Sequence, residues 1–364
     1  MAGYDNKVAT ICDNKKLKIA IGHFSIKLLL MNWLMKNDCK KGFASCLLLV
    51  FALLGCKTHK LAEQATVSPV KAPANFKVVG YLLSGEIANG KAARFDVSKL
   101  THLNIFFNGT DSTGKFRHLP HLDSTIAAAH KNQVIVLGTI GNAINMAMIV
   151  DTNRAKFIDS LVSSTIELHL DGIDVDLEGD HINKSYEGFV SDLSIALKAK
   201  GKIMTAAVAT WESAQLTAKA LTYFDFLNIM TYDATGPWNL NQPGSHSPYS
   251  MAISDMDFWT KNRGISKDRL TLGLPFYGYG FGPAIQREFH YSQIVSAYPG
   301  SENLDTVAVT PGNIIYYNGI PTIKRKVTFA LQNAGGVMMW EMMEDADGDK
   351  SLLKAVDEMV GIGK

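Results

Sequence analysis

The stretch Asp171-Gly172-Ile173-Asp174-Val175-Asp176-Leu177-Glu178 alternates aliphatic and acidic residues from Ile173 onward. Alternate side chains of a β-strand point to opposite faces, so one face would be apolar and the other would carry three carboxyl groups in a row. Asp171 has the opposite parity, and we expect it at the start of the strand in a different environment. Close carboxyl groups repel one another unless they share protons or serve a site. The stretch therefore predicts a functional site, with a solvated acidic edge strand or a carboxylate metal site as alternatives.

The composition of the 364-residue chain excludes several kinds of site. The formal net charge is +2 and the main body has no basic cluster, so we expect no nucleic-acid partner. All four cysteines lie at or before Cys56, which leaves the rest of the chain without disulfides, thiolate nucleophiles or cysteine-bound zinc. The ten histidines form no HExxH motif. We therefore expect neither a metal nor another cofactor.

Residues 35–56 have the pattern of a bacterial lipoprotein signal peptide. Lysines precede an uncharged segment from Gly42 to Leu54 that is too short to span a membrane, and its end, Leu53-Leu54-Gly55-Cys56, resembles a lipobox. The alternative is a buried apolar helix. We expect a lipid on Cys56 that anchors the protein to a membrane of the bacterial cell envelope, on its periplasmic or outer surface. Residues 1–34 fit no signal-peptide pattern and are interpreted as an extension upstream of the true start, and residues 57–75 as a flexible tether.

From residue 76 to residue 364, short apolar runs alternate with amphipathic segments. Eight strands, each followed by a helix-like segment, indicate a (β/α)8 TIM barrel of the α/β class. A doubly wound open sheet is the alternative, but no Gly-x-Gly-x-x-Gly motif follows the first run. The predicted strands are Lys77 to Leu83, His102 to Phe107, Val134 to Thr139, Gly172 to Leu177, Ile203 to Ala209, Phe226 to Thr231, Leu270 to Pro275 and Gly336 to Glu341.

The connection from about residue 280 to residue 319 is too long for a structureless loop inside a compact domain. It lies between the seventh strand and a predicted helix from Ile320 to Asn333, and it contains strand-like pieces from Thr306 to Val309 and from Ile314 to Tyr317. We therefore expect a short α+β insertion on the rim of the barrel, between strand 7 and helix 7.

The predicted strand ends bring acids and aromatic residues together, because active sites of such barrels form at the carboxyl ends of the strands. Aromatic faces beside carboxyl groups suit sugar rings, whereas a metal site needs no such lining. This observation disfavours the metal alternative. The residues at these ends are Asp176 and Glu178 (fourth strand), Met230, Tyr232, Asp233 and Trp238 (sixth), Tyr277 (seventh) and Trp340 (eighth).

The DxxDxDxE motif formed by Asp171, Asp174, Asp176 and Glu178 resembles that of glycoside hydrolase family 18, the chitinases and related endo-N-acetylglucosaminidases. Three further segments resemble the sixth-strand, seventh-strand and eighth-strand motifs of this family and occur in the same order. The resemblance extends over nearly the whole of residues 76–364. The three segments are Met230-Thr231-Tyr232-Asp233, Leu274-Pro275-Phe276-Tyr277-Gly278 and Gly335-Gly336-Val337-Met338-Met339-Trp340.

The resemblance implies a substrate-assisted mechanism, for which this family is an exception among glycosidases. Glu178 would protonate the glycosidic oxygen, and the 2-acetamido group of the sugar would attack the anomeric carbon. Asp176 would orient the acetamido N–H and share a proton with Asp174, and Tyr232 would donate to the acetamido carbonyl. The residues that we expect to contact the substrate are Asp171, Trp211, Met230, Asp233, Trp238, Tyr277 and Trp340. A core position is the alternative for Trp340, and loop packing for Trp211.

The third strand departs from the Ser-x-Gly-Gly ending of the family and reads Thr139-Ile140-Gly141-Asn142. The hydroxyl of Thr139 could still bond to Asp174, so we expect the proton network to survive. Asn142 in place of Gly changes the loop beside the −2 side of the cleft.

Three functions are compatible with these patterns, and N-acetylglucosamine-containing saccharide is the expected partner in each. The first is retaining, endo-acting hydrolysis of β-1,4 bonds in chitin or chitooligosaccharides. The second is an endo-β-N-acetylglucosaminidase that cuts the chitobiose core of N-glycans. The third is a lectin that binds chitin without cutting it, which the presence of Glu178 disfavours.

Overall fold

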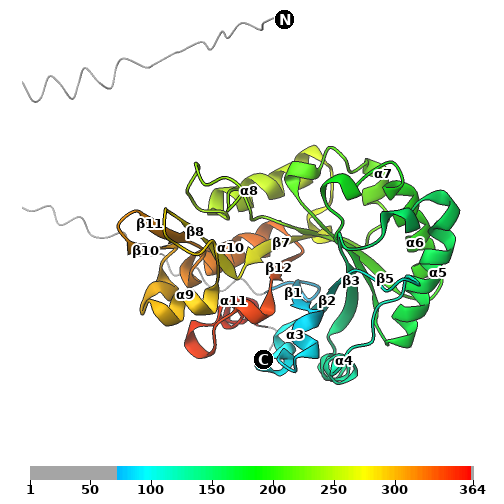
Figure 1. The fold of residues 1–364 in the computed structure, drawn as a ribbon, viewed down its shortest axis with the longest axis horizontal. Helices are drawn as coiled ribbons and strands as arrows, with labels where there is room; N and C mark the ends of the chain where they lie inside the picture. Colours follow the sequence, from blue (N-terminus) through cyan, green and yellow to red (C-terminus); the bar gives the residue numbers. More distant parts are fainter. Residues whose placement is uncertain (1–71, 362–364) are drawn as a thin grey trace, which may run out of the picture. The chain divides into compact units, whose positions relative to one another are not determined.

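Eight parallel strands close into a barrel in the computed structural model, which describes residues 72–361. Neighbouring strands follow the order β1-β12-β7-β6-β5-β4-β3-β2, and β12 supplies the eighth barrel strand because four strands of a smaller sheet precede it (Figure 1). The predicted TIM barrel is confirmed. The barrel strands are β1 (Lys77–Leu83), β2 (His102–Asn108), β3 (Ile135–Ile140), β4 (Gly172–Val175), β5 (Ile203–Val208), β6 (Phe226–Ile229), β7 (Leu270–Pro275) and β12 (Gly336–Trp340).

Helices surround the barrel and cover its apolar outer face (Figure 1). Ile173, Val175 and Leu177 are buried in the core that also contains Leu161 and Leu193 from two of these helices. The aliphatic face of the acidic strand is therefore the one that packs against the helix layer. The helices are α3 (Ser84–Ala88), α4 (Leu122–Lys131), α5 (Asp151–Glu167), α6 (Tyr186–Lys198), α7 (Ala218–Leu221), α8 (Tyr249–Asp257), α10 (Ile320–Asn333) and α11 (Leu352–Val360).

The predicted strand boundaries lie within two residues of the observed ones, and those of β1 and β7 coincide with them. The largest differences are at the ends of β4 and β6, and β4 ends at Val175 rather than Leu177. The neighbouring strand β3 already ends at Ile140, whose carbonyl accepts the last ladder bond from the N–H of Asp176 (2.8 Å). Beyond Asp176 the chain remains extended but has left the sheet.

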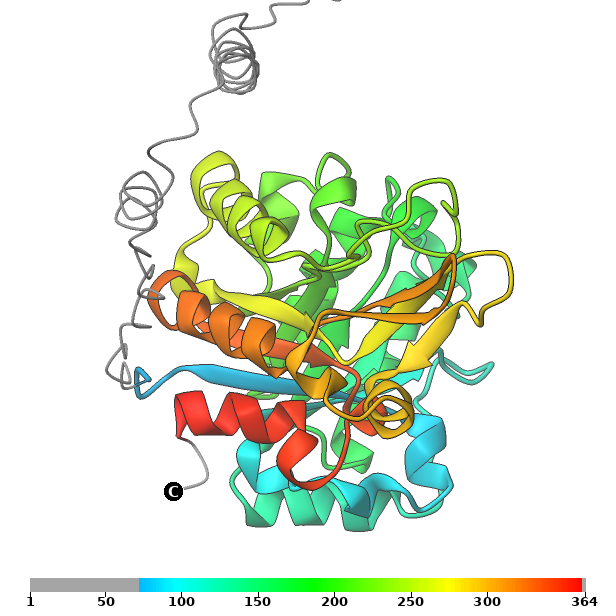
Figure 2. The same ribbon diagram turned by 90° about the vertical axis from the view of Figure 1, so that its left-hand side faces the viewer.

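The predicted insertion is a four-stranded antiparallel sheet with one helix, and it begins at Tyr277, directly after β7 and three residues before the expected start. Its strands pair in the order β10-β11-β8-β9. Figure 2 shows α10 and α11 lying next to each other on the same side of the barrel as this sheet. The elements are β8 (Tyr277–Phe281), β9 (Glu288–His290), α9 (Tyr291–Ala297), β10 (Thr306–Thr310) and β11 (Asn313–Tyr316).

The predicted signal peptide, the lipid site at Cys56 and most of the predicted tether lie outside the described residues, so the lipid anchor stays a prediction. Within residues 72–361, no helix combines the length and the apolar run that a membrane span would need.

A fully buried lysine on α10 connects the insertion to the loop that follows β6. Lys326 Nζ donates to the carbonyl and the hydroxyl oxygens of Ser247 (2.7 and 2.6 Å) and to Asn318 Oδ1 (2.6 Å). Burial lowers the pKa of Lys326 to about 7, but three acceptors around one nitrogen favour the ammonium form. The Ser247 hydroxyl in turn donates to the carbonyl of Thr231 at the end of β6.

Lys326→Met is expected to destabilise the barrel by about 2–4 kcal/mol, because it leaves three buried acceptors without a donor. Lys324→Met on the same helix is the matched control, since Lys324 forms an exposed ion pair with Glu358 (2.6 Å) that should contribute about 1 kcal/mol or less. Urea unfolding followed by circular dichroism measures both variants. Equal midpoints for the two variants would contradict the structural role of Lys326.

Candidate active site

The three acids of the fourth strand lie on one face and become less buried toward the carboxyl end of the barrel. Asp174 is completely buried, Asp176 is 6% exposed, and Glu178 is partly exposed at the rim. The alternation predicted from sequence is therefore present. The innermost acid belongs to the barrel interior, and the outermost can reach a bound molecule.

Asp174 is held by hydroxyl and amide groups from four other strands. Its Oδ2 accepts hydrogen bonds from Tyr81 Oη (2.7 Å) and from Thr139 Oγ1 (3.1 Å). Its Oδ1 accepts from Thr205 Oγ1 (2.5 Å) and from Asn228 Nδ2 (3.3 Å). Burial raises the pKa of Asp174, and these four donors oppose the rise. The predicted bond from Thr139 is confirmed, whereas Tyr81, Thr205 and Asn228 were not predicted.

Asp176 has a buried oxygen, Oδ1, for which the described residues offer no partner. The proton bridge expected between Asp176 and Asp174 is not formed in this part of the chain, because the four donors already occupy both oxygens of Asp174. Burial raises the pKa of Asp176 well above its ordinary value, and the charges of Glu178, Asp174 and Glu212 raise it further. A proton on Asp176 is thus favoured by its surroundings rather than by sharing with Asp174.

Glu178 is suited to hold its proton to a higher pH than an ordinary glutamate does. Burial raises the pKa of its carboxyl group, the charge of Asp233 raises it further, and His181 opposes the rise. A carboxylic acid that stays protonated above its ordinary range can act as a general acid.

Asp233 is the centre of a polar cluster at the end of β6. Its Oδ1 accepts hydrogen bonds from Tyr277 Oη (2.6 Å) and from Tyr279 Oη (3.1 Å), and His246 Nδ1 lies 3.4 Å away. Asp233 has a positive φ of 65°, a conformation that non-glycine residues seldom adopt and that functional sites often contain. Tyr277 and Tyr279, both expected at the rim from their place after the seventh strand, therefore lie beside Asp233, while His246 joins the site without having been predicted there.

The hydroxyl of Tyr232 has only a weak acceptor. It lies 3.8 Å from the thioether sulfur of Met338, and the Tyr232 side chain is buried. Thioethers accept hydrogen bonds poorly, so this hydroxyl is available to a stronger acceptor. The charge of Asp176 contributes to the raised pKa of Tyr232, which indicates that the two groups face the same space.

A groove of about 620 Å³ opens beside these groups. Its walls carry two tryptophans with widely exposed rings, Trp211 (64%) and Trp238 (62%). Trp238 packs edge-on against Tyr279 at 5.6 Å between ring centroids. The predicted residues that line this one groove are Glu178, Trp211, Met230, Tyr232, Asp233 and Trp238.

Trp340 lies at the end of β12 with its ring against two aromatic side chains of the barrel interior. The ring centroids are 5.4 Å from Tyr81 and 5.0 Å from Phe106. Trp340 remains partly exposed, whereas Trp259 on the segment after α8 is fully buried. One face of Trp340 is thus supported by the barrel, as a platform for a ligand requires.

Asp171 is not part of this site, which corrects the prediction that it contacts substrate. It precedes β4 and therefore lies at the amino end of the strand, opposite the end that carries Glu178. There its Oδ2 accepts a hydrogen bond from the N–H of Val136 (2.8 Å) and lies 2.9 Å from His130 Nε2. Its contacts join β3, β4 and α4.

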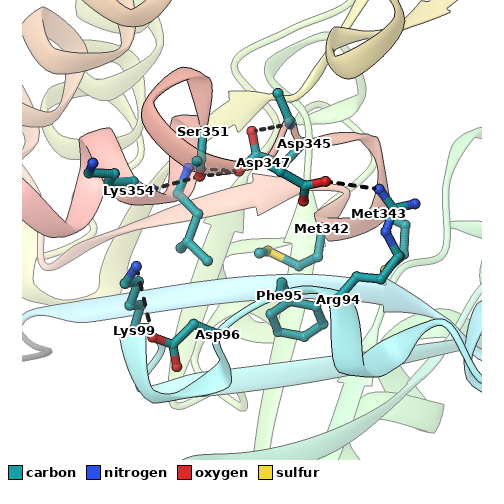
Figure 3. A pocket seen from close by; sticks show the side chains of 13 residues that line it. Arg94, Phe95, Asp96, Lys99, Met342, Met343, Asp345, Asp347, Ser351 and Lys354 are labelled. Carbon is teal, nitrogen blue, oxygen red and sulfur yellow. Dashed lines mark hydrogen bonds and ion pairs between the residues drawn. The ribbon is translucent and has the colours of Figure 1, made fainter.

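A second pocket, of about 360 Å³, lies between the segment before β2 and the start of α11 (Figure 3). Its partly buried acid, Asp345, accepts hydrogen bonds from the N–H groups of Leu352 and Leu353 and from Ser351 Oγ, so it caps α11. Figure 3 shows Arg94 paired with Asp347 in the same pocket. Within residues 72–361, no group of three or more His, Cys, Asp or Glu side chains is arranged to hold a metal ion.

Two solved structures are similar to this chain in sequence and fold. The GH18 chitinase ChiB from the chitin utilization locus of Flavobacterium johnsoniae is 33% identical, with a TM-score of 0.72, and the match covers 79% of this chain and 94% of that one. A chitinase from Bacteroides thetaiotaomicron is 28% identical, with a TM-score of 0.70, and covers 78% and 96% of the two chains.

Curated relatives match over shorter segments. Chitinase 63 of Streptomyces plicatus is 29% identical over 172 residues, which are 38% of this chain and 28% of that protein. Di-N-acetylchitobiase of Mus musculus is 25% identical over 257 residues, which are 66% of this chain and 64% of that protein. The chain spans between 8% and 58% of the length of the first four curated relatives that it matches.

A model of the family described as "Glycosyl hydrolases family 18" matches residues 77–345, from the first barrel strand to the segment after the last. The match includes all three acids of the β4 segment and the cluster around Asp233. The chain therefore belongs to glycosyl hydrolase family 18.

Proposed function

We propose that the protein hydrolyses β-1,4 bonds between N-acetylglucosamine units of chitin or chitooligosaccharides, with the acetamido group of the substrate as nucleophile. One observation carries the proposal: Asp176 has an unpartnered buried oxygen and Tyr232 has a hydroxyl with only a thioether beside it. An acceptor and a donor of this kind match the N–H and the carbonyl of a secondary amide. An N-acetyl group would satisfy both.

The proposed reaction has two steps. In the first, the protonated Glu178 gives its proton to the glycosidic oxygen, the bond from that oxygen to the anomeric carbon breaks, and the acetamido oxygen bonds to the same carbon. The product is an oxazolinium ion, whose positive charge favours the ionised form of Asp176 and would be stabilised by it. In the second, Glu178 removes a proton from water, and the resulting hydroxide opens the ring with overall retention at the anomeric carbon.

The surroundings of the acids support a chain-like saccharide as the substrate. Trp340 would lie beneath the sugar that carries the acetamido group, and Trp238 and Trp211 would stack on sugars farther along the groove. Asp233 is held by two tyrosine hydroxyls and would bond to the sugar from the side. These exposed rings favour an extended ligand over a small molecule.

Turnover of chitotetraose, with a high-mannose glycoprotein assayed in parallel, tests the proposal. Formation of two disaccharides, or of a trisaccharide and N-acetylglucosamine, would support hydrolysis of chitooligosaccharides. Cleavage of the glycoprotein alone would instead assign an endo-β-N-acetylglucosaminidase. Binding of chitotetraose without cleavage of either substrate would assign a lectin.

The pH dependence should follow the proton on Glu178. Its pKa is raised above the ordinary 4.5, so activity should persist where an ordinary glutamate is ionised and fall as the pH rises through the raised pKa. Asp233→Asn removes the charge that contributes to this rise, so the basic limb of kcat/KM should move to lower pH. Asp159→Asn, an exposed position on α5, is the control. A basic limb that stays at the wild-type pH in Asp233→Asn would contradict the electrostatic assignment.

A further inference from the structure

The backbone that carries Glu178 has left the barrel sheet and is held by side chains. The N–H of Glu178 donates to Asn142 Oδ1 (2.9 Å), and the N–H of Gly179 donates to Glu212 Oε2 (3.3 Å). Asn142 belongs to the loop after β3 and Glu212 to the short helix after β5, and these two strands flank β4 in the barrel. Two successive peptide N–H groups are thus fixed from opposite sides.

Glu212 is only 1% exposed, and both of its carboxyl oxygens accept from backbone N–H groups. The second bond joins Oε1 to the N–H of Ala209 (3.0 Å) in its own loop. No lysine, arginine or histidine of residues 72–361 forms an ion pair with this carboxyl group. A buried carboxyl group without a counter-ion lowers the stability of the fold, which suggests that Glu212 has a functional role.

The charged neighbours of Glu212 are acids of the site itself. Burial and the charge of Glu178 raise the pKa of Glu212 to about 7, and the charge of Glu212 contributes to the raised pKa of Asp176 and of Tyr186 on α6. His181 faces Glu178 from the turn that follows β4, with Nδ1 3.3 Å from its carbonyl oxygen. Repulsion between acids is mutual, so a charge on Glu212 also disfavours ionisation of Glu178.

We infer that Asn142 and Glu212 are positioning residues for the catalytic acid: they fix the Glu178–Gly179 peptide between two loops, and Glu212 also places a negative charge beside Glu178. The inference rests on the proposed function. Glu212 follows Trp211, whose exposed ring lines the groove, so one carboxyl group links a substrate platform to the acid. Asn142, which departs from the family motif, supplies an acceptor that glycine could not.

The inference predicts different kinetic effects for substitutions of Asn142 and of Glu212. Asn142→Ala removes a neutral acceptor, so kcat should fall about 10-fold through misplacement of Glu178 while the basic limb of kcat/KM keeps its pH. Glu212→Gln removes a charge as well as an acceptor, so kcat should fall by a similar factor and the basic limb should move down by about half a pH unit or more. Glu344→Gln is the matched control, a half-buried acid whose interacting acids are Glu341 and Glu288. Its kcat and basic limb should remain those of the wild type.

Kinetics on chitotetraose between pH 4 and pH 9, with thermal melting of each variant, measure these signatures. A Glu212→Gln variant with wild-type kcat and a wild-type basic limb would overturn the inference. A wild type without turnover would overturn the proposed function instead. If Glu212→Gln does not fold, Glu212→Asp keeps the charge on a shorter side chain. Lower kcat with an unmoved basic limb would then support the positioning role, and unchanged kcat would overturn it.

Discussion

Glu178→Gln is expected to lower kcat on chitotetraose by about 10³-fold or more while leaving binding of the oligosaccharide nearly unchanged. Glutamine has almost the same shape but cannot give a proton to the leaving oxygen. The aromatic walls of the groove, Trp211 and Trp238, do not depend on that proton. The loss should therefore appear in kcat, and the dissociation constant measured by calorimetry should change less than about threefold.

The matched control is Glu167→Gln, since Glu167 is an exposed acid at the end of α5 that pairs with Lys115 (2.7 Å). It should keep wild-type kinetics. Equal turnover by the wild type and Glu178→Gln would remove Glu178 from its role as general acid. Tight binding by both proteins without turnover by either would favour the lectin.

The barrel could be predicted because each strand is a short apolar run between polar turns. Lys77–Leu83 and Leu270–Pro275 were located to the residue, since Ser84-Gly85 follows the first run and the second run ends at a proline. The end of β4 could not be located from the sequence, because it depends on where β3 stops and not on the side chains of β4. A strand ends when its neighbour no longer offers a hydrogen bond.

The partners of Asp174 show what a single strand cannot reveal. Tyr81, Thr205 and Asn228 come from β1, β5 and β6, and only the registers of a closed barrel bring them to one carboxyl group. A signal was present in Asn228, a polar residue inside the apolar run Phe226–Ile229. Buried polar side chains need partners, so this position indicated an interior polar cluster without indicating its other members.

The misplacement of Asp171 has a simple geometric cause. The motif groups it with Glu178, but parallel strands of a barrel expose only their carboxyl ends to the active site. The first residue of a strand motif and the last one therefore lie at opposite ends of the barrel. Asn142 and Glu212 were missed as positioning residues for a different reason: they act from loops whose paths the sequence pattern does not determine.

Asp176→Asn is expected to lower kcat by about 10²–10³-fold and at the same time to stabilise the fold. Asparagine keeps the shape and one acceptor oxygen, but it loses the negative charge that would stabilise the oxazolinium ion. The carboxyl group it replaces is buried, has an unpartnered oxygen and lies near three other acids. A buried charge without a counter-ion makes folding less favourable. Its removal should therefore increase the free energy of unfolding.

The stabilisation should depend on pH in a defined direction. The pKa of Asp176 is raised from an ordinary 3.8, so at pH values between 3.8 and the raised pKa the folded state binds more protons than the unfolded state. Wild-type stability therefore falls as the pH rises through that window. The advantage of Asp176→Asn should be small below about pH 4 and should grow as the pH increases.

Asp174→Asn provides the contrast that separates the two acids. Asp174 accepts four hydrogen bonds, and an asparagine there would present its NH₂ group to donors such as Tyr81 Oη or Thr205 Oγ1. Urea midpoints at pH 5 and pH 8 should therefore fall for Asp174→Asn and rise for Asp176→Asn. A lower midpoint for Asp176→Asn would mean that its carboxyl group stabilises the barrel. In that case its unpartnered oxygen would no longer support a role in binding the acetamido group.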